Sequence, residues 1–293
     1  MHYSSAPHKK HLEETPFDHI RVMVLTIGFP RSGSSLLGYL LTAHPDMVIA
    51  DEPTVSYEPM QYTGVLKDIN QKKRPDKDIL YKAGMRKMFD YILSVDYTRR
   101  QRSVRRDETD VVILRGKRYK RYIHVPNQYQ GSFRSLKVIG IKHSRQNVEV
   151  LSKGKILENL KGKLQKIGIT LKFIFTVRNP YDMIATAVRT NADDRGKFIN
   201  FCEDNVKILK QVDAEKVFIA QHEDMVKNPQ QQLTKLCDFL QVSISSGYLE
   251  DCVSQVVKEP YRSRFELDWT EDQKTELSLL IKKYNFFSGY SWD

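Results

Sequence analysis

The chain has 293 residues, of which 40% are hydrophobic and 28% charged, as in ordinary soluble globular proteins with enough length for a sizeable core. Its formal net charge of +11 suits an anionic ligand, a nucleic acid or an acidic membrane surface. The three cysteines form no C-x-x-C pair, which disfavours a disulfide framework or a zinc site.

The N-terminal segment is polar and lacks the apolar core of a signal peptide. No apolar run approaches the ~20 residues that span a bilayer. We therefore expect a cytoplasmic protein without a metal ion and without a membrane partner. Residues 1–20 are expected to form a flexible tail, and residues 21–293 a single domain.

The first predicted element is a strand over Val22–Ile27, followed by a tight turn over 28–35 and a helix over Ser35–Ala43. A strand, a glycine-containing turn and a helix are the setting of a phosphate-binding loop. The turn contains hydroxyl groups that either donate to a bound anion or cap the helix. They belong to Ser32, Ser34 and Ser35.

The spacing of Gly28, Gly33 and Ser35 fits the G-x-x-x-x-G-K-[ST] template except at one position. Ser34 stands where the template requires the lysine that reaches the β- and γ-phosphates of a nucleoside triphosphate. The only nearby cation is Arg31. The turn is therefore predicted to hold a phosphate that is not the end of ATP or GTP.

Residues 62–122 show an alternation of predicted strands and helices least clearly, and they contain runs of basic residues. This segment is a cap or insertion that builds an acceptor pocket, a solvated basic surface, or a nucleic-acid patch. Aromatic residues lie among the basic ones, as base stacking would need, but no nucleic-acid-binding signature accompanies them. We expect no nucleic-acid partner. A helix over Lys82–Leu93 and a strand over Val111–Leu114 are predicted here.

The remaining chain alternates strands and helices, which predicts an α/β protein. The strands are expected at Val138–Lys142, Leu171–Val177 and Val217–Ala220, and the helices at Ile156–Ile167, Tyr181–Val188, Phe198–Val212, Pro229–Leu240 and Thr270–Tyr284. The expected architecture is a P-loop-type three-layer fold with a mainly parallel central sheet flanked by helices. Ligands of such sheets bind outside the carboxyl ends of the strands.

A second anion site is predicted after the Leu171–Val177 strand. Arg178 stands at its carboxyl end, and an arginine there can fork onto a phosphate, with Thr186 on the following helix sharing it. The alternative is that Arg178 pairs with Asp182 and caps the helix. Two anion sites on one sheet edge suggest a nucleotide with phosphates at both ends.

Several motifs together resemble the sulfotransferases. Residues 30–35, His44-Pro45 and Glu52-Pro53 look like the 5′-phosphosulfate loop of that family, and residues 177–182 with Thr186 look like its 3′-phosphate motif. Residues 222–229 and 237–241 are similar to a helical segment that follows these motifs in the family. Residues 261–265 and 269–273 resemble members of the carbohydrate and tyrosylprotein branch, so the chain as a whole looks closer to the carbohydrate, tyrosylprotein and bacterial branches than to the cytosolic aryl branch. The matches span about Val22 to Tyr284.

The resemblance implies 3′-phosphoadenosine 5′-phosphosulfate as donor and no metal. It assigns Pro30, Arg31, Ser32, Gly33, Ser34 and Ser35 to the 5′ end of the donor. It assigns Arg178 and Thr186 to the 3′-phosphate, where a serine is more usual than Thr186. Arg262 and Arg264 are loosely assigned to close over the nucleotide, because the glycine-rich closing loop of the cytosolic branch is absent.

Sulfuryl transfer needs a base to take the proton of the attacking hydroxyl. Glu52 resembles the catalytic glutamate of the tyrosylprotein branch, and otherwise is a surface carboxylate. His143 is the other candidate, although its surroundings read Ile-Lys-His-Ser and a structural role is the alternative. Lys142 or Arg31 would stabilise charge on the leaving phosphate.

The sequence thus predicts a sulfotransferase that acts on a hydroxyl group of a small molecule or sugar. The alternatives are a P-loop nucleotide kinase or NTPase, which the serine at position 34 opposes, and a basic non-enzymatic nucleotide- or nucleic-acid-binding protein.

Overall fold

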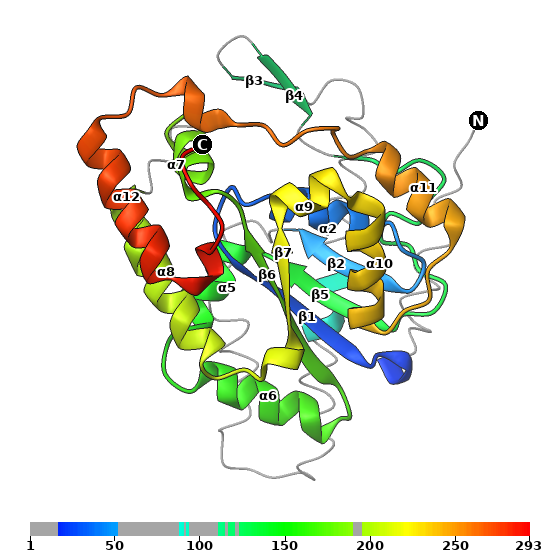
Figure 1. Ribbon diagram of the computed structural model, residues 1–293. Helices are drawn as coiled ribbons and strands as arrows, with labels where there is room; N and C mark the ends of the chain where they lie inside the picture. The colour runs from blue at the N-terminus through cyan, green and yellow to red at the C-terminus, as the bar shows by residue number, and fades with distance from the viewer. Residues whose placement is uncertain are drawn as a thin grey trace.

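The computed structural model describes residues 17–51, 88–90, 92–93, 111–114, 117–120, 123–189 and 195–293. Five parallel strands form a central sheet in the order β2-β5-β1-β6-β7 (Figure 1). The strands are β1 (Val22–Gly28), β2 (Met47–Asp51), β5 (Val138–Lys142), β6 (Thr170–Val177) and β7 (Val217–Gln221). A separate antiparallel hairpin joins β3 (Val111–Leu114) to β4 (Lys117–Lys120).

The centre of the sheet is buried on both sides. Every residue of β1 is buried, and so is every residue of β6 except Thr170. Nearly continuous apolar runs of this kind form strands whose two faces are both covered by helices. The site-forming turns therefore start from fully buried strand ends at the centre of the sheet.

Helices cover the sheet on both faces, giving three layers (Figure 1). The core on one face includes α5 (Ser144–Leu151), α6 (Ile156–Lys166), α8 (Arg195–Leu209) and α12 (Glu271–Lys283). The core on the other face includes α2 (Ser34–Thr42), α10 (Pro229–Leu240) and α11 (Ser246–Ser254). Two further helices follow the carboxyl ends of β6 and β7, namely α7 (Pro180–Arg189) and α9 (His222–Lys227).

The fold class predicted from the sequence is confirmed, with a central sheet that is entirely parallel. The predicted strands next to each anion motif are present as β1 and β6. The sequence did not predict β2, β4, α5, α9 or α11. The predicted strand Val111–Leu114 exists, but it belongs to the hairpin rather than to the parallel sheet.

Parts of the predicted domain plan lie outside the described residues, namely residues 1–16 of the tail and most of the segment 62–122. The structure describes the last residues of the predicted tail. Phe17–His19 form a 3-10 turn, the ring of Phe17 lies 5.7 Å from that of Phe89, and Ile20 is buried. Among the described helices, none has the length and apolar character needed to cross a membrane.

Candidate active site

The two predicted anion motifs start from neighbouring strands. β1 and β6 are paired in parallel, with Gly28 opposite Thr176, and the amide of Phe29 donates to the carbonyl of Thr176 at 3.3 Å. Arg31 follows three residues after Gly28, and Arg178 follows two residues after Thr176. The two arginines therefore lie on chain segments that leave the same edge of the sheet side by side, as the sequence predicted.

The backbone of the first turn has left-handed conformations at Gly28 (φ 111°), Arg31 (φ 65°) and Gly33 (φ 88°). A Cβ at Gly28 would lie 2.2 Å from the carbonyl oxygen of Thr176, so only glycine allows the two strands to approach here. Gly33 is the N-cap of α2 and provides no side-chain cap. The first amides of α2 are thus left for an external acceptor, which is the geometry of a helix-terminal anion site.

The serines of the turn have different environments. Ser32 is buried, and its hydroxyl lies 2.6 Å from the carbonyl oxygen of Phe29 and 2.8 Å from Oγ1 of Thr176. Its hydroxyl therefore ties the turn to β6, and its assignment to the 5′ end of the donor stays a prediction. Ser34 is also buried, whereas Ser35 is exposed and accepts from Nζ of Lys142 at 2.8 Å.

The side-chain amide of Asn205, on α8, holds the start of the turn. Its Oδ1 accepts from the amide of Gly28 at 3.0 Å, and its Nδ2 donates to the carbonyls of Gly28 and Phe201 at 3.2 and 2.7 Å. Asn205 is completely buried. Sequence reasoning missed this residue, because it lies 177 positions from Gly28 and carries no local motif.

Lys142 at the end of β5 is 1% exposed and forms an ion pair with Asp51, with 3.0 Å between Nζ and Oδ1. The hydroxyl of Tyr39 donates to the other carboxylate oxygen of Asp51 at 3.3 Å. Asp51 therefore fixes the lysine against Ser35 at the N-terminus of α2. Glu52, the first of the two predicted bases, is the next residue along the chain and lies outside the described residues.

His143, the second predicted base, is the N-cap of α5. Its Nδ1 accepts from the amide of Gln146 at 3.4 Å, and its own amide donates to Oγ1 of Thr26 at 3.1 Å. The imidazole is half-buried. This residue thus has a structural role in starting α5, in addition to its place at the carboxyl end of β5.

Arg178 is 7% exposed. Its Nη2 donates to the carbonyl of Tyr261, and its Nε is buried without a hydrogen-bond partner. Burial lowers the pKa of Arg178, and the carboxylates of Asp182 and Glu223 partly oppose that effect. A buried guanidinium with an unused donor is a site that an anionic ligand would satisfy.

The alternative pairing of Arg178 with Asp182 is not what the structure contains. Asp182 is bound by Arg264, with 2.7 Å between Oδ2 and Nη1 and 2.8 Å between Oδ1 and the backbone amide. Arg264 is 4% exposed and also donates to the carbonyl of Asp293 at 3.1 Å. Arg264 therefore joins α7 to the C-terminal residue, and its role in closing over the nucleotide stays a prediction.

Thr186 faces the same C-terminal segment. Its Oγ1 lies 2.9 Å from Oγ of Ser263, which in turn donates to the carbonyl of Asp182 at 2.9 Å. Arg262 is exposed at the N-cap of the 3-10 turn η3 (Ser263–Glu266). The segment 261–264 therefore borders the second anion motif through Tyr261, Ser263 and Arg264.

His222, the first residue of α9, lies between the two motifs. A Cβ at Gly33 would be 2.4 Å from Nδ1 of its imidazole. Burial, with a smaller contribution from the positive charge of Arg178, lowers the pKa of His222 to about 4. The next residue, Glu223, accepts from the amide of Asn179 at 3.0 Å and from the hydroxyl of Tyr290 at 2.7 Å. The first residue of α9 thus packs on the turn after β1, and the second accepts a hydrogen bond from the turn after β6.

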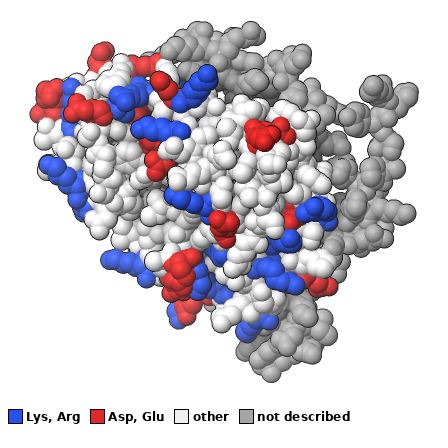
Figure 2. All heavy atoms as spheres, turned by 45° about the vertical axis from the view of Figure 1, so that its right-hand side comes forward, with Lys and Arg blue, Asp and Glu red and all other residues white. Residues whose placement is uncertain are grey.

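On the face drawn in Figure 2, the described basic side chains are interspersed with acidic ones and do not gather into one stripe. A duplex-binding surface needs such a stripe, so this face gives the nucleic-acid alternative no support. In the described part of the chain, no three His, Cys, Asp or Glu residues form a group that could hold a metal ion.

The sequence matches one family of known proteins over most of its length. A profile described as "Sulfotransferase family" matches residues 24–246. No curated protein matches the sequence significantly.

Solved structures with a similar arrangement include three sulfotransferases. The sulfotransferase domain of the olefin synthase from Synechococcus PCC 7002 is 18% identical, with a TM-score of 0.41 and coverage of 86% of this chain and 85% of that one. STF9 from Mycobacterium avium is 12% identical, with a TM-score of 0.45 and coverage of 94% and 79%. Mouse SULT7A1, solved in complex with PAP, is 11% identical, with a TM-score of 0.45 and coverage of 94% and 86%.

Proposed function

The chain belongs to the sulfotransferase family, and from this we propose that it transfers a sulfonate group from 3′-phosphoadenosine 5′-phosphosulfate to a hydroxyl group of a small molecule or sugar. The donor supplies an activated sulfonate and a bisphosphorylated adenosine as leaving group. The residues of this chain bind and orient it, neutralise its charge and accept the proton of the acceptor.

One observation carries the donor assignment. Gly28 in β1 and Thr176 in β6 are paired where the two turns begin, and an arginine follows each of these residues within three positions. A ligand with phosphates at both ends fits this edge, whereas a nucleoside triphosphate needs a lysine at position 34, where the chain has serine. Arg178 has a buried Nε without a partner, which is the donor that a 3′-phosphate would use.

The amides at the start of α2, the guanidinium of Arg31 and the hydroxyl of Ser35 are the proposed contacts of the 5′ end. Arg31 is exposed at the tip of the turn. Thr186 and Arg262 border the proposed 3′-phosphate position. His222 packs on Gly33, and burial, together with the positive charge of Arg178, keeps its imidazole neutral at pH 7. A neutral ring there adds no charge to the proposed binding edge.

For the transfer step, we propose that Glu52 or His143 takes the proton of the attacking hydroxyl. Lys142 is held at Ser35 by its ion pair with Asp51, so a positive charge lies beside the proposed 5′ end. This charge and that of Arg31 would stabilise the leaving phosphate as the bond to sulfur breaks. No step requires a metal ion.

The test of this function is ligand-induced stabilisation followed by turnover. Adenosine 3′,5′-bisphosphate, added at 100 times its dissociation constant, is expected to raise the unfolding free energy by about 2.7 kcal/mol and therefore the melting temperature. The full chain with the sulfated donor and a panel of small hydroxyl compounds and sugars should release this bisphosphate. An increase in melting temperature with ATP and magnesium, together with none for the bisphosphate, would overturn the proposal in favour of a kinase or NTPase.

A further inference from the structure

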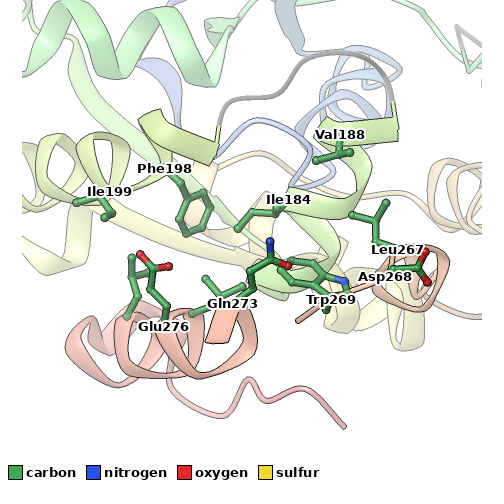
Figure 3. A pocket seen from close by; sticks show the side chains of 11 residues that line it. Ile184, Val188, Phe198, Ile199, Leu267, Asp268, Trp269, Gln273 and Glu276 are labelled. Carbon is green, nitrogen blue, oxygen red and sulfur yellow. The ribbon is translucent and has the colours of Figure 1, made fainter. Parts of the chain in front are cut away.

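A cavity of about 430 Å³ lies between α7, α8 and α12, and none of its lining residues belongs to the two anion motifs (Figure 3). Side chains from all three helices form its walls, and the segment 267–269 closes one side. The apolar walls include Ile184, Val188, Phe198, Trp269 and Leu277. The volume is within the range of small-molecule sites, which are about 300–1,000 Å³ and mostly apolar.

This cavity is separate from the proposed donor site. Ile184 and Val188 lie one turn apart on α7, whereas Thr186 is rotated by about 200° from Ile184 and belongs to the other side of the helix. The cavity is nevertheless close to the first turn, because the ring of Phe198 packs against that of Phe29 with 5.2 Å between centroids. A molecule in the cavity would therefore contact Phe198, which packs on the turn, without touching the backbone amides of the turn.

Two polar lining groups are already used inside the protein. The indole nitrogen of Trp269 donates to the carbonyl of Arg264 at 3.0 Å, so this ring presents carbon atoms to the cavity. The Oε1 atom of Gln273 accepts from the amide of Thr270 at 3.1 Å in the capping box of α12.

Two carboxylates remain at the rim. Asp268 and Glu276 are exposed, and neither pairs with any lysine or arginine in the described part of the chain. In Figure 3 they lie at opposite ends of the cavity. Among the side chains that the structure describes, no lysine or arginine lines the cavity, although the protein as a whole carries a net charge of +11.

We propose that this cavity is a second ligand site, which binds a small hydrophobic molecule with a cationic end. The apolar walls take the hydrocarbon or aromatic part, and the rim carboxylates select a positive charge over a neutral or negative group of the same size. No lining residue is shared with the proposed donor site, so both sites can be occupied at once.

The charge preference is tested with three probes of nearly equal shape, 4-phenylbutylamine, 4-phenylbutanol and 4-phenylbutanoate, by calorimetry on the full chain. We expect the amine to bind about fivefold more tightly than the alcohol, and the carboxylate to bind most weakly, at low salt. Equal affinities for the three probes, or no binding of the amine at 10 mM, would overturn the proposal.

Two variants locate the binding. Asp268→Asn combined with Glu276→Gln should remove the preference for the amine over the alcohol, while Asp272→Asn, an exposed carboxylate on the same helix, should leave it intact. Val188→Phe should abolish binding of all three probes by filling the cavity. If the amine binds the double variant as before, the rim carboxylates are not its partners. These two substitutions are on the surface, so this arm does not depend on how well Val188→Phe folds.

A competition experiment separates this site from the donor site. Adenosine 3′,5′-bisphosphate should bind with unchanged stoichiometry while the amine is saturating. Displacement of the amine by the bisphosphate would show that the two sites overlap and would overturn the proposal. Failure of the bisphosphate to bind at all would contradict the donor assignment but leave the binding of the amine as evidence for the cavity.

Discussion

A methyl group added at Gly33 would lie 2.4 Å from Nδ1 of His222, so the α-carbon of the first and the imidazole of the second are packed in direct contact. The contact joins the turn after β1 to the helix that follows β7. The position also has φ of 88°, which a side chain rarely adopts. Steric exclusion and backbone conformation therefore both require glycine here, and the two costs can be measured apart.

We expect Gly33→Ala to destabilise the protein by about 2–3 kcal/mol, from overpacking and backbone strain together. Adding His222→Ala should recover about 1 kcal/mol or more, because it removes the obstructing ring but not the strain. Urea unfolding of the four proteins of this double-mutant cycle gives both values. Gly154→Ala is the matched control, since that glycine has φ of 53° with no atom near its Cβ. Additive effects of the two substitutions would contradict the contact.

Stability should depend on pH through His222. Its folded pKa of about 4 lies below the ordinary value of 6.5, so the unfolded chain binds more protons between these values. The unfolding free energy is therefore complete above pH 6.5 and falls by up to about 3 kcal/mol as pH decreases to 4.

His222→Gln should reduce this fall, as measured by urea unfolding between pH 4.5 and 7.5. His44, whose pKa is also lowered by burial, is present in both proteins, so the difference between them isolates His222. Identical pH profiles would show that the imidazole at position 222 is not buried in the way described.

Arg178→Ala should weaken adenosine 3′,5′-bisphosphate by about 10- to 100-fold, since a charge-assisted contact contributes about 1.5–3 kcal/mol. Calorimetric titration measures the change. Lys216→Ala removes one positive charge just before the start of β7, at the opposite end of the sheet, and should change the affinity little. Equal losses in the two variants would mean that only net charge matters and that position 178 is not a contact.

The choice between the two bases is open to a direct experiment. If Glu52 is the base, Glu52→Gln lowers turnover by roughly 10²-fold or more while donor affinity is kept. His143→Asn is the appropriate partner variant, because asparagine keeps an acceptor for the amide of Gln146 and so preserves the cap of α5. Full activity of the first variant and loss in the second would assign the proton transfer to His143 instead.

Because the side chain of Asn205 bonds to the backbone of Gly28, one substitution at position 205 is expected to lower the stability of the protein strongly. Asn205→Asp keeps the shape but places a carboxylate against the carbonyls of Gly28 and Phe201, to which the amide now donates. We expect a loss of about 3 kcal/mol or more in unfolding free energy. Asn159→Asp, at an exposed position on α6, introduces the same charge as a control and should be nearly neutral.

The sequence predicted the parts of the site that are local. The apolar run of β1, its turn and the start of α2 are contiguous, as are β6, Arg178 and the start of α7, so periodicity and glycine spacing were sufficient. The shared sheet edge followed from the rule that ligands bind at the carboxyl ends of parallel strands.

The contacts that support these motifs depend on distant parts of the chain. Asp182 lies four residues after Arg178, so a local pair was the alternative to an anion site, but the partner of Asp182 is Arg264, 82 residues away. Ser32 carries a hydroxyl that could donate to a ligand, but in the structure this hydroxyl donates to Oγ1 of Thr176 on the neighbouring strand β6. The short strand β2 and the polar helix α5 also lacked a strong pattern. Such outcomes follow from tertiary packing, which single-sequence patterns do not contain.

Because the amide of Asn205 bonds both backbone polar groups of Gly28, the first half of the turn is ordered before any ligand arrives. Binding of an anion there therefore needs no further loss of conformational entropy at that peptide unit. Rapid-mixing traces of bisphosphate association should accordingly follow one exponential whose rate grows in proportion to ligand concentration, without the plateau that a prior loop rearrangement would impose.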